Sequence, residues 1–207
     1  MSVPSRPGIS PQTLTKAAVE IVDEPEPGSI RIPYFDIGAE RTSHCRWRLP
    51  KPKPNGQKYT QPPDSGYPVY FPPEPLRSVG GDLYITEGEF KALKLYQEGF
   101  QVIGLPGLYC HQSRKDEEDG GSRDDKLQLL PGIAAAIRLV KPSRVVFLCD
   151  ADTSHNYDFA RSAHFLAYVL QRDFNGLPVI LPRLPADGPK GIDDFGAAHP
   201  RRFFPSV

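Results

Sequence analysis

Proline is spread unevenly along this chain of 207 residues, with 15 of the 24 prolines in residues 1–76 and 9 in residues 77–207. A proline has no backbone N–H to donate, and it breaks the interior of a helix or of a central strand. The proline-rich part therefore cannot form a helical bundle, and we expect turns and short extended segments there. Residues 77–207 have room for regular helices and strands.

The proline-rich part divides in two. Residues 1–12 are rich in Pro and Ser, and we expect a flexible N-terminal tail over residues 1–28. Short β-like segments separated by Gly and Pro follow at residues 30–32, 45–49 and 67–71. They predict a small, mainly β subdomain over residues 29–76 with long connections.

Beyond residue 76, strand-like and helix-like segments alternate. The expected strands are residues 83–86, 101–104, 144–149 and 178–181, and the expected helices are residues 89–98, residues 155–172 and one that begins near Pro131. Strands separated by single helices predict a parallel sheet flanked by helices, an α/β domain over residues 77–200. In such sheets, ligand and metal sites form beyond the carboxyl ends of the strands.

Acidic residues follow three of these strands. Glu87 lies at the first strand-to-helix turn, Asp150 and Asp152 follow the third strand, and Asp193 and Asp194 come after the last. Carboxylates held close together need a proton or a cation between them, and oxygen ligands suit Mg²⁺ or Mn²⁺. The pattern predicts a divalent metal site. The alternative is that Asp150 and Asp152 cap the next helix.

The helix after Glu87 carries further charges. We expect Glu89 and Glu98 to lie on its solvated faces. Lys91, one helical turn from Glu87, is a candidate ligand for a bound phosphate, and the alternative is an ordinary exposed lysine.

A basic stretch lies in the proline-rich part. Residues 41–63 contain six Lys or Arg and no Asp or Glu, with Trp47 and Tyr59 between them. Positive charge with interleaved aromatic rings is typical of a groove for single-stranded nucleic acid, because the charges bind phosphates and the rings stack on bases. A solvated basic loop with core aromatics is the alternative.

The composition sets further limits. Lys and Arg number 25 and Asp and Glu number 25, so the formal net charge is zero, which leaves room for opposite charges on separate surfaces. Three cysteines indicate a reducing compartment, and we expect a soluble cytoplasmic protein without membrane contact. His44-Cys45 and Cys110-His111 lack the spacer of a zinc site and are expected in the core or as incidental residues.

The motifs of the second part resemble the Toprim domain of bacterial-type primases, topoisomerases and related nucleases. The resemblance rests on residues 86–88 (TEG), 102–107 (VIGLPG) and 149–152 (CDAD). Upstream, residues 30–38, 46–48, 58–63 and 69–71 resemble the small N-terminal subdomain of the primase catalytic core. Downstream, residues 184–195 resemble the loop with the family's last acid. The resemblance implies a Toprim, Rossmann-like sheet, and it is closest to the Toprim-like primase segment of phage and plasmid replication proteins.

The resemblance also implies roles for individual residues. Glu87 would be the general base or a metal ligand, Asp150 and Asp152 would bind the divalent ions, and Asp193 or Asp194 would support them. Near the template and nucleotide would lie Arg46, Arg48, Lys58 and Tyr59.

The implied activity is primer synthesis, that is, Mg²⁺- or Mn²⁺-dependent nucleotidyl transfer. Its partners would be a single-stranded DNA template and nucleoside triphosphates, with a replicative helicase as a further candidate. Two alternatives share the fold: a metal-dependent Toprim nuclease, and a non-catalytic module that binds nucleic acid.

Overall fold

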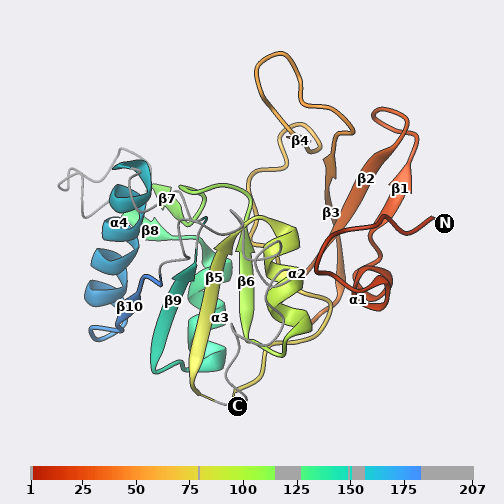
Figure 1. Cartoon of the computed structure of the whole chain (residues 1–207). Coiled ribbons are helices and arrows are strands. Elements are labelled where there is room, and N and C mark those ends of the chain that lie inside the picture. The colour runs from red at the N-terminus through yellow and green to blue at the C-terminus, as the bar shows by residue number, and fades with distance from the viewer. Residues whose placement is uncertain (1, 79, 115–126, 149, 151–156, 183–207) are drawn as a thin grey trace.

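The computed structural model of the chain describes residues 2–78, 80–114, 127–148, 150 and 157–182. Two sheets, one antiparallel and one parallel, form its framework (Figure 1). Among the described residues, no helix is long and apolar enough to cross a bilayer.

The antiparallel sheet lies in the proline-rich part, as the sequence predicts. Its strand order is β1-β2-β3-β4, and its strands are β1 (Glu20–Val22), β2 (Ser29–Phe35), β3 (Arg41–Arg48) and β4 (Tyr59–Thr60). The turn between β2 and β3 is set by Asp36, whose carboxylate accepts hydrogen bonds from the backbone N–H groups of Gly38 and Glu40, both at 2.9 Å. Such a side chain tightens the turn by satisfying backbone donors. β2 faces the core with Ile32 and Tyr34, which are fully buried.

The parallel sheet lies in the second part, with the order β10-β9-β5-β6. Its strands are β5 (Asp82–Glu87), β6 (Val102–Leu105), β9 (Arg144–Leu148) and β10 (Val179–Ile180), and the helices are α2 (Glu89–Gln97), α3 (Pro131–Val140) and α4 (Tyr157–Asp173). Every strand pair in it is parallel, which confirms the expected mixed α/β architecture. A separate antiparallel pair joins β7 (Gln112–Arg114) and β8 (Leu127–Leu129).

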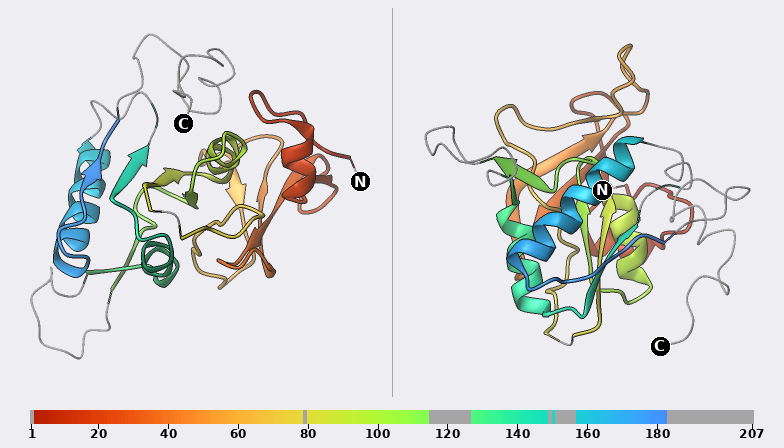
Figure 2. Two further views of the ribbon diagram at one scale, coloured as in Figure 1. Left: turned by 90° about the horizontal axis from the view of Figure 1, so that it is seen from below. Right: turned by 90° about the vertical axis from the view of Figure 1, so that its left-hand side faces the viewer.

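The two faces of the parallel sheet bury different partners. Helices lie on both sides of the sheet (Figure 2). Leu83 and Ile85 of β5 and Phe147 of β9 pack in one cluster with α3 and α4, whereas Val102 and Leu148 belong to a second cluster with α2. Successive side chains of a strand point to opposite faces, so β5, β6 and β9 each contribute to both clusters. The second cluster also contains residues of α1 and β2, so it joins the two sheets.

A short extended segment connects the sheets. Tyr70 exchanges two backbone hydrogen bonds of 2.8 Å with Gly104 at the edge of β6, and Phe71 forms a bridge with Phe35 of β2. A Cβ at Gly104 would lie 3.2 Å from the Cβ atoms of Tyr70 and Ala92, so glycine permits this approach. The segment fixes the antiparallel sheet beside β6.

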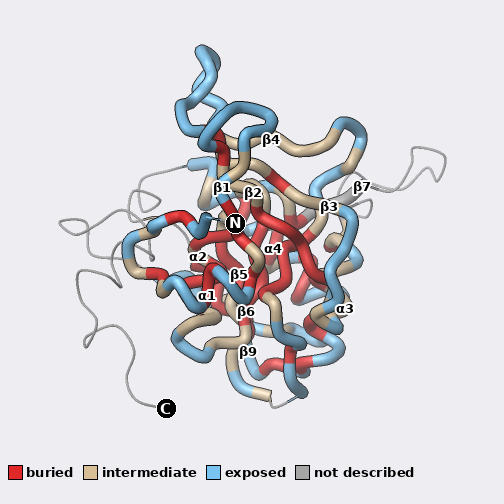
Figure 3. Tube along the Cα trace, turned by 90° about the vertical axis from the view of Figure 1, so that its right-hand side faces the viewer, coloured by how far each residue is buried: buried red, intermediate tan, exposed pale blue. Residues whose placement is uncertain are grey.

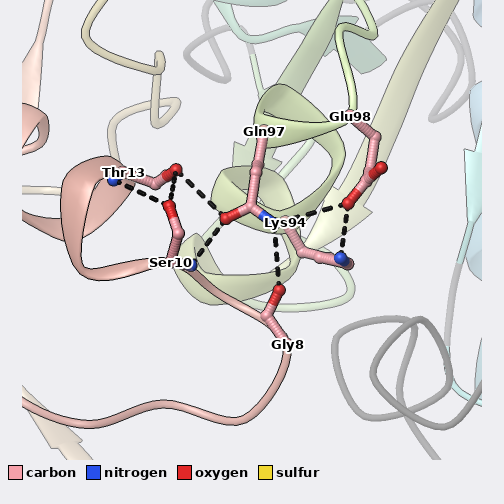
Figure 4. A network of polar contacts seen from close by, with 6 residues as sticks. All are labelled: Gly8, Ser10, Thr13, Lys94, Gln97 and Glu98. Carbon is pink, nitrogen blue, oxygen red and sulfur yellow. Dashed lines mark hydrogen bonds and ion pairs between the residues drawn. The ribbon is translucent and has the colours of Figure 1, made fainter. Parts of the chain in front are cut away.

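Residues 2–28, where we expected a flexible tail, instead contain α1 (Pro11–Lys16) and β1. Ser10 caps α1 by accepting a hydrogen bond from the Thr13 backbone N–H at 3.1 Å, and Leu14 is 1% exposed. The side-chain oxygen of Gln97 in α2 accepts a hydrogen bond from the backbone N–H of Ser10 at 2.6 Å, and its amide nitrogen donates one to the Gly8 carbonyl at 3.1 Å (Figure 4). A strand of three residues and a helix of six are too short to show a periodic pattern of apolar residues. The expectation of a tail therefore rested on composition alone. The domain boundaries stay a prediction.

Buried backbone runs through the middle of the molecule, and the connection between β3 and β4 projects from it (Figure 3). Residues 50–58 of this connection are all exposed.

Candidate functional site at the ends of β5 and β9

Glu87 and Asp150 follow neighbouring strands of the parallel sheet. β5 pairs with β9 in the register Thr86 with Leu148, Glu87 is the last residue of β5, and Asp150 lies two residues beyond β9. The carboxyl ends of parallel strands meet at one edge of a sheet. Both carboxylates therefore lie at the edge where the sequence predicts a site, and both are partly exposed.

Gly88 makes the turn from β5 into α2 possible. Its φ is 89°, a left-handed conformation that favours glycine, and its N–H donates to the Leu105 carbonyl at 2.7 Å. The turn starts α2 directly after Glu87. The Glu87 carboxylate makes no hydrogen bond or ion pair with any described residue.

Lys91 lies beside Asp150. Its ammonium Nζ is 2.5 Å from Oδ1 of Asp150, and the two side chains are 17% and 22% exposed. The sequence suggested Lys91 as a ligand for a bound phosphate. In this structure its partner is the carboxylate of Asp150.

The donor set fits a hard divalent cation in its chemistry, because two carboxylates at adjoining strand ends offer oxygen ligands. Among the described residues, no group of three or more His, Cys, Asp and Glu side chains is arranged to hold a metal ion. Asp152, Asp193 and Asp194, the other predicted ligands, lie outside the described residues. Glu87 and Asp150 are thus the part of the predicted ligand set that can be located.

Behind this edge lies a buried ion pair that the sequence did not predict. Arg46 of β3 donates from Nη1 to Oε1 of Glu89 at 2.7 Å and to the Pro106 carbonyl at 3.3 Å, and the Tyr34 hydroxyl donates to the same Glu89 oxygen at 2.6 Å. Burial, followed by the Glu89 charge, raises the pKa of Tyr34 well above its usual value, so the phenol stays protonated as a donor. Arg46 and Tyr34 thereby fix the first turn of α2, two residues from Glu87.

The expectation that Glu89 lies on a solvated face is wrong, because its residue is 1% exposed. Glu98 is exposed, as expected. The partners of Glu89 come from 43 and 55 residues upstream, and no local pattern in the helix reveals them. The one signal in the sequence is that an arginine on the core-facing side of a strand, here Arg46, needs an acidic partner, which a helix acid such as Glu89 can supply.

A pocket of about 260 Å³ lies beside β4, in the basic stretch. Its lining residues are Arg46, Gln57, Lys58, Tyr59, Thr60, Gln61 and Tyr67. Three of the residues predicted to bind nucleic acid therefore line one pocket. The Arg46 guanidinium lies 4.8 Å from the centre of the Tyr59 ring and covers one of its faces. Burial, with a smaller contribution from the Glu89 charge, raises the pKa of Tyr59 to about 12, which keeps its hydroxyl neutral.

Two further features of the pocket bear on binding. Arg48 pairs with Tyr59 in the sheet register but is not among the lining residues. Tyr67, which the sequence suggested only as part of a strand, is 62% exposed and offers an uncovered ring. Whether these residues bind nucleic acid stays a prediction.

The comparisons with known proteins agree with the described architecture. A family model described as "Domain of unknown function (DUF3854)" matches residues 79–202. The crystal structure of the primase fragment of the Bacteriophage T7 primase-helicase protein superposes with a TM-score of 0.56 at 19% sequence identity, covering 97% of this chain and 71% of that chain. No curated protein matches significantly. At this identity the likeness shows the fold alone, which is primase-like.

Proposed function

Because this chain belongs to the DUF3854 family, whose description assigns no activity, we propose its function from its site and fold: a primase-like nucleotidyltransferase that makes short primers on single-stranded DNA. The observation that carries the proposal is the position of Glu87 and Asp150 at the ends of adjoining strands within a fold like that of the T7 primase fragment. We assign the site to a Toprim-type domain over residues 77–200, serving the replication of a phage, plasmid or other mobile element.

The proposed chemistry uses the two carboxylates differently. Glu87, which has no partner among the described residues, would take the proton from the attacking hydroxyl of the growing primer. Asp150, with Asp152 and one of Asp193 and Asp194, would hold Mg²⁺ or Mn²⁺. When bound, such an ion neutralises the charge that develops on the transferred phosphoryl group.

The template side of the proposal rests on the pocket beside β4. Lys58 is exposed and can neutralise a phosphate, and the ring of Tyr67 can accept a base. Arg46 lines this pocket and also bonds Glu89, so it joins the pocket to the turn that carries Glu87. Arg48 belongs to the same proposed template surface, and a replicative helicase is a proposed partner.

Primer synthesis on single-stranded DNA with nucleoside triphosphates and Mg²⁺ or Mn²⁺ tests the proposal. We expect product from the wild type and a loss of about 100-fold or more in Glu87→Gln, since general base catalysis contributes at least that much. Asp150→Ala should be similarly inactive. Glu26→Gln removes an exposed carboxylate from a loop of the antiparallel sheet and should match the wild type. Absence of product, or product that survives both site substitutions, contradicts the proposal.

One observation favours a second candidate, a non-catalytic module that binds nucleic acid. Lys91 already supplies a positive charge to Asp150, so this carboxylate has a counter-ion without metal. A binding module would retain salt-dependent DNA binding in Glu87→Gln and Asp150→Ala and would show no turnover in any variant.

A further inference from the structure

Lys91 reaches the candidate metal site from α2. It lies four residues after Glu87, and its Nζ approaches Oδ1 of Asp150 to 2.5 Å. Both side chains are largely shielded from water, at 17% and 22% exposure. An ion pair in this environment is screened less than one on an open surface.

Two other cations on or against α2 have carboxylate partners of their own among the described residues. Arg46 bonds Glu89 at 2.7 Å, and Lys94 bonds Glu98 at 2.5 Å with its own side chain 6% exposed. Of these three cations, Lys91 is the one that pairs with Asp150.

The Lys91 ammonium lies 2.5 Å from Oδ1 of Asp150 and so occupies the space that a metal ion bound to that oxygen would need. A divalent ion bound to Asp150 would also lie within a few ångströms of the Lys91 charge and would be repelled by it. Metal binding at Oδ1 of Asp150 is therefore opposed by Lys91 and is favoured when Lys91 moves away.

We propose that Lys91 is a tethered cation that competes with the divalent metal for Asp150 and makes metal binding at this site weak. This inference rests on the proposed function, because it takes Asp150 as a metal ligand. In the metal-free protein Lys91 balances the Asp150 charge, and the metal enters by displacing it. Lys91 is then a regulating residue of the site, in place of the phosphate ligand that the sequence suggested.

Mn²⁺ binding to the full chain, measured from the paramagnetic resonance signal of the free ion, tests this directly and needs no turnover. Lys91→Met removes the charge and keeps the length of the side chain. We expect it to tighten Mn²⁺ binding by at least about fivefold, since even a partly shielded ion pair contributes on that order. Lys91→Arg keeps the charge and should stay close to the wild type. Lys51→Met removes one charge from an exposed loop and should also leave the affinity unchanged.

Adding Asp150→Asn to Lys91→Met should abolish the gain, which shows that the tighter ion is bound at Asp150. The inference is overturned if Lys91→Met binds no more tightly than the wild type, or if Lys51→Met tightens binding equally. If Lys91→Met has no effect while Asp150→Asn still weakens binding, the proposed metal site stands and only the role of Lys91 falls. If Asp150→Asn changes nothing in either background, the proposed metal site falls as well.

Discussion

His111 is a single buried residue whose titration should affect folding. It is 1% exposed, and its Nε2 lies 2.8 Å from the Ser162 hydroxyl. Burial lowers its pKa from 6.5 to about 4, against a smaller opposing effect of a hydrogen bond at Ser162. Between these two pH values the unfolded chain binds a proton that the folded chain does not, so stability is present above pH 6.5 and is lost as the pH falls towards 4.

From this shift we expect the free energy of unfolding to drop by about 2 to 3 kcal/mol between pH 7 and pH 4.5, at about 1.4 kcal/mol per pKa unit. Urea denaturation at both pH values measures the drop. Carboxylates add their own pH dependence, so the comparison is with His111→Gln, in which this part of the drop should be missing. An equal drop in the two proteins would contradict the assignment.

Single residues also mark the limit of the sequence-based predictions. His111, expected in the core or as an incidental residue because it lacks the spacer of a zinc site, is a core residue. The parallel strands that precede Glu87 and Asp150 could be predicted, because strand ends follow from local apolar runs, whereas the role of the two acids stays a prediction. The burial of Glu89 could not be predicted, because it depends on Arg46 in the other sheet.

The helix α2 is the element that joins these parts. It is fixed at its start by Arg46 through Glu89, touches the candidate metal site through Lys91 and holds α1 through Gln97. The start of α2 and the four parallel strands could be read from periodicity, whereas α1 and β1 are too short for that and are stabilised by packing on α2 and β2.

Breaking the buried pair of α2 should cost far more than breaking a surface pair. We expect Glu89→Gln to lower the free energy of unfolding by about 3 to 5 kcal/mol, because it leaves the Arg46 charge buried and unpaired. Asp82→Asn removes one partner of a pair with Arg144, whose side chain is 52% exposed, and should cost under about 1 kcal/mol.

The double variant Arg46→Met with Glu89→Gln removes both charges of the pair. It should be less destabilised than the sum of the two single variants, because no isolated charge remains. Urea denaturation of the four proteins gives the coupling directly. Additive losses would mean that the two side chains contribute independently.

At the scale of the molecule, zero net charge conceals two separate surfaces. Arg46 and Lys58 of the basic stretch line the pocket beside β4, and the carboxylates Glu87 and Asp150 follow β5 and β9. Arg46 belongs to both regions, since it lines the pocket and bonds the helix that starts after Glu87. A nucleic acid held in the pocket would therefore lie beside the proposed site of primer synthesis.

Binding of fluorescent single-stranded DNA, measured by anisotropy at several salt concentrations, tests this arrangement. Tyr67→Ala should weaken binding by about 1 to 3 kcal/mol through lost base stacking, with little change in the salt dependence. Lys58→Ala should weaken binding and reduce the salt slope by about one ion, because a phosphate contact is lost. Tyr157, 78% exposed on α4, is the matched control, and Tyr157→Ala should bind as the wild type does. If Tyr157→Ala and Tyr67→Ala weaken binding equally, the pocket beside β4 is not the binding surface, and any affinity for DNA arises elsewhere on the molecule.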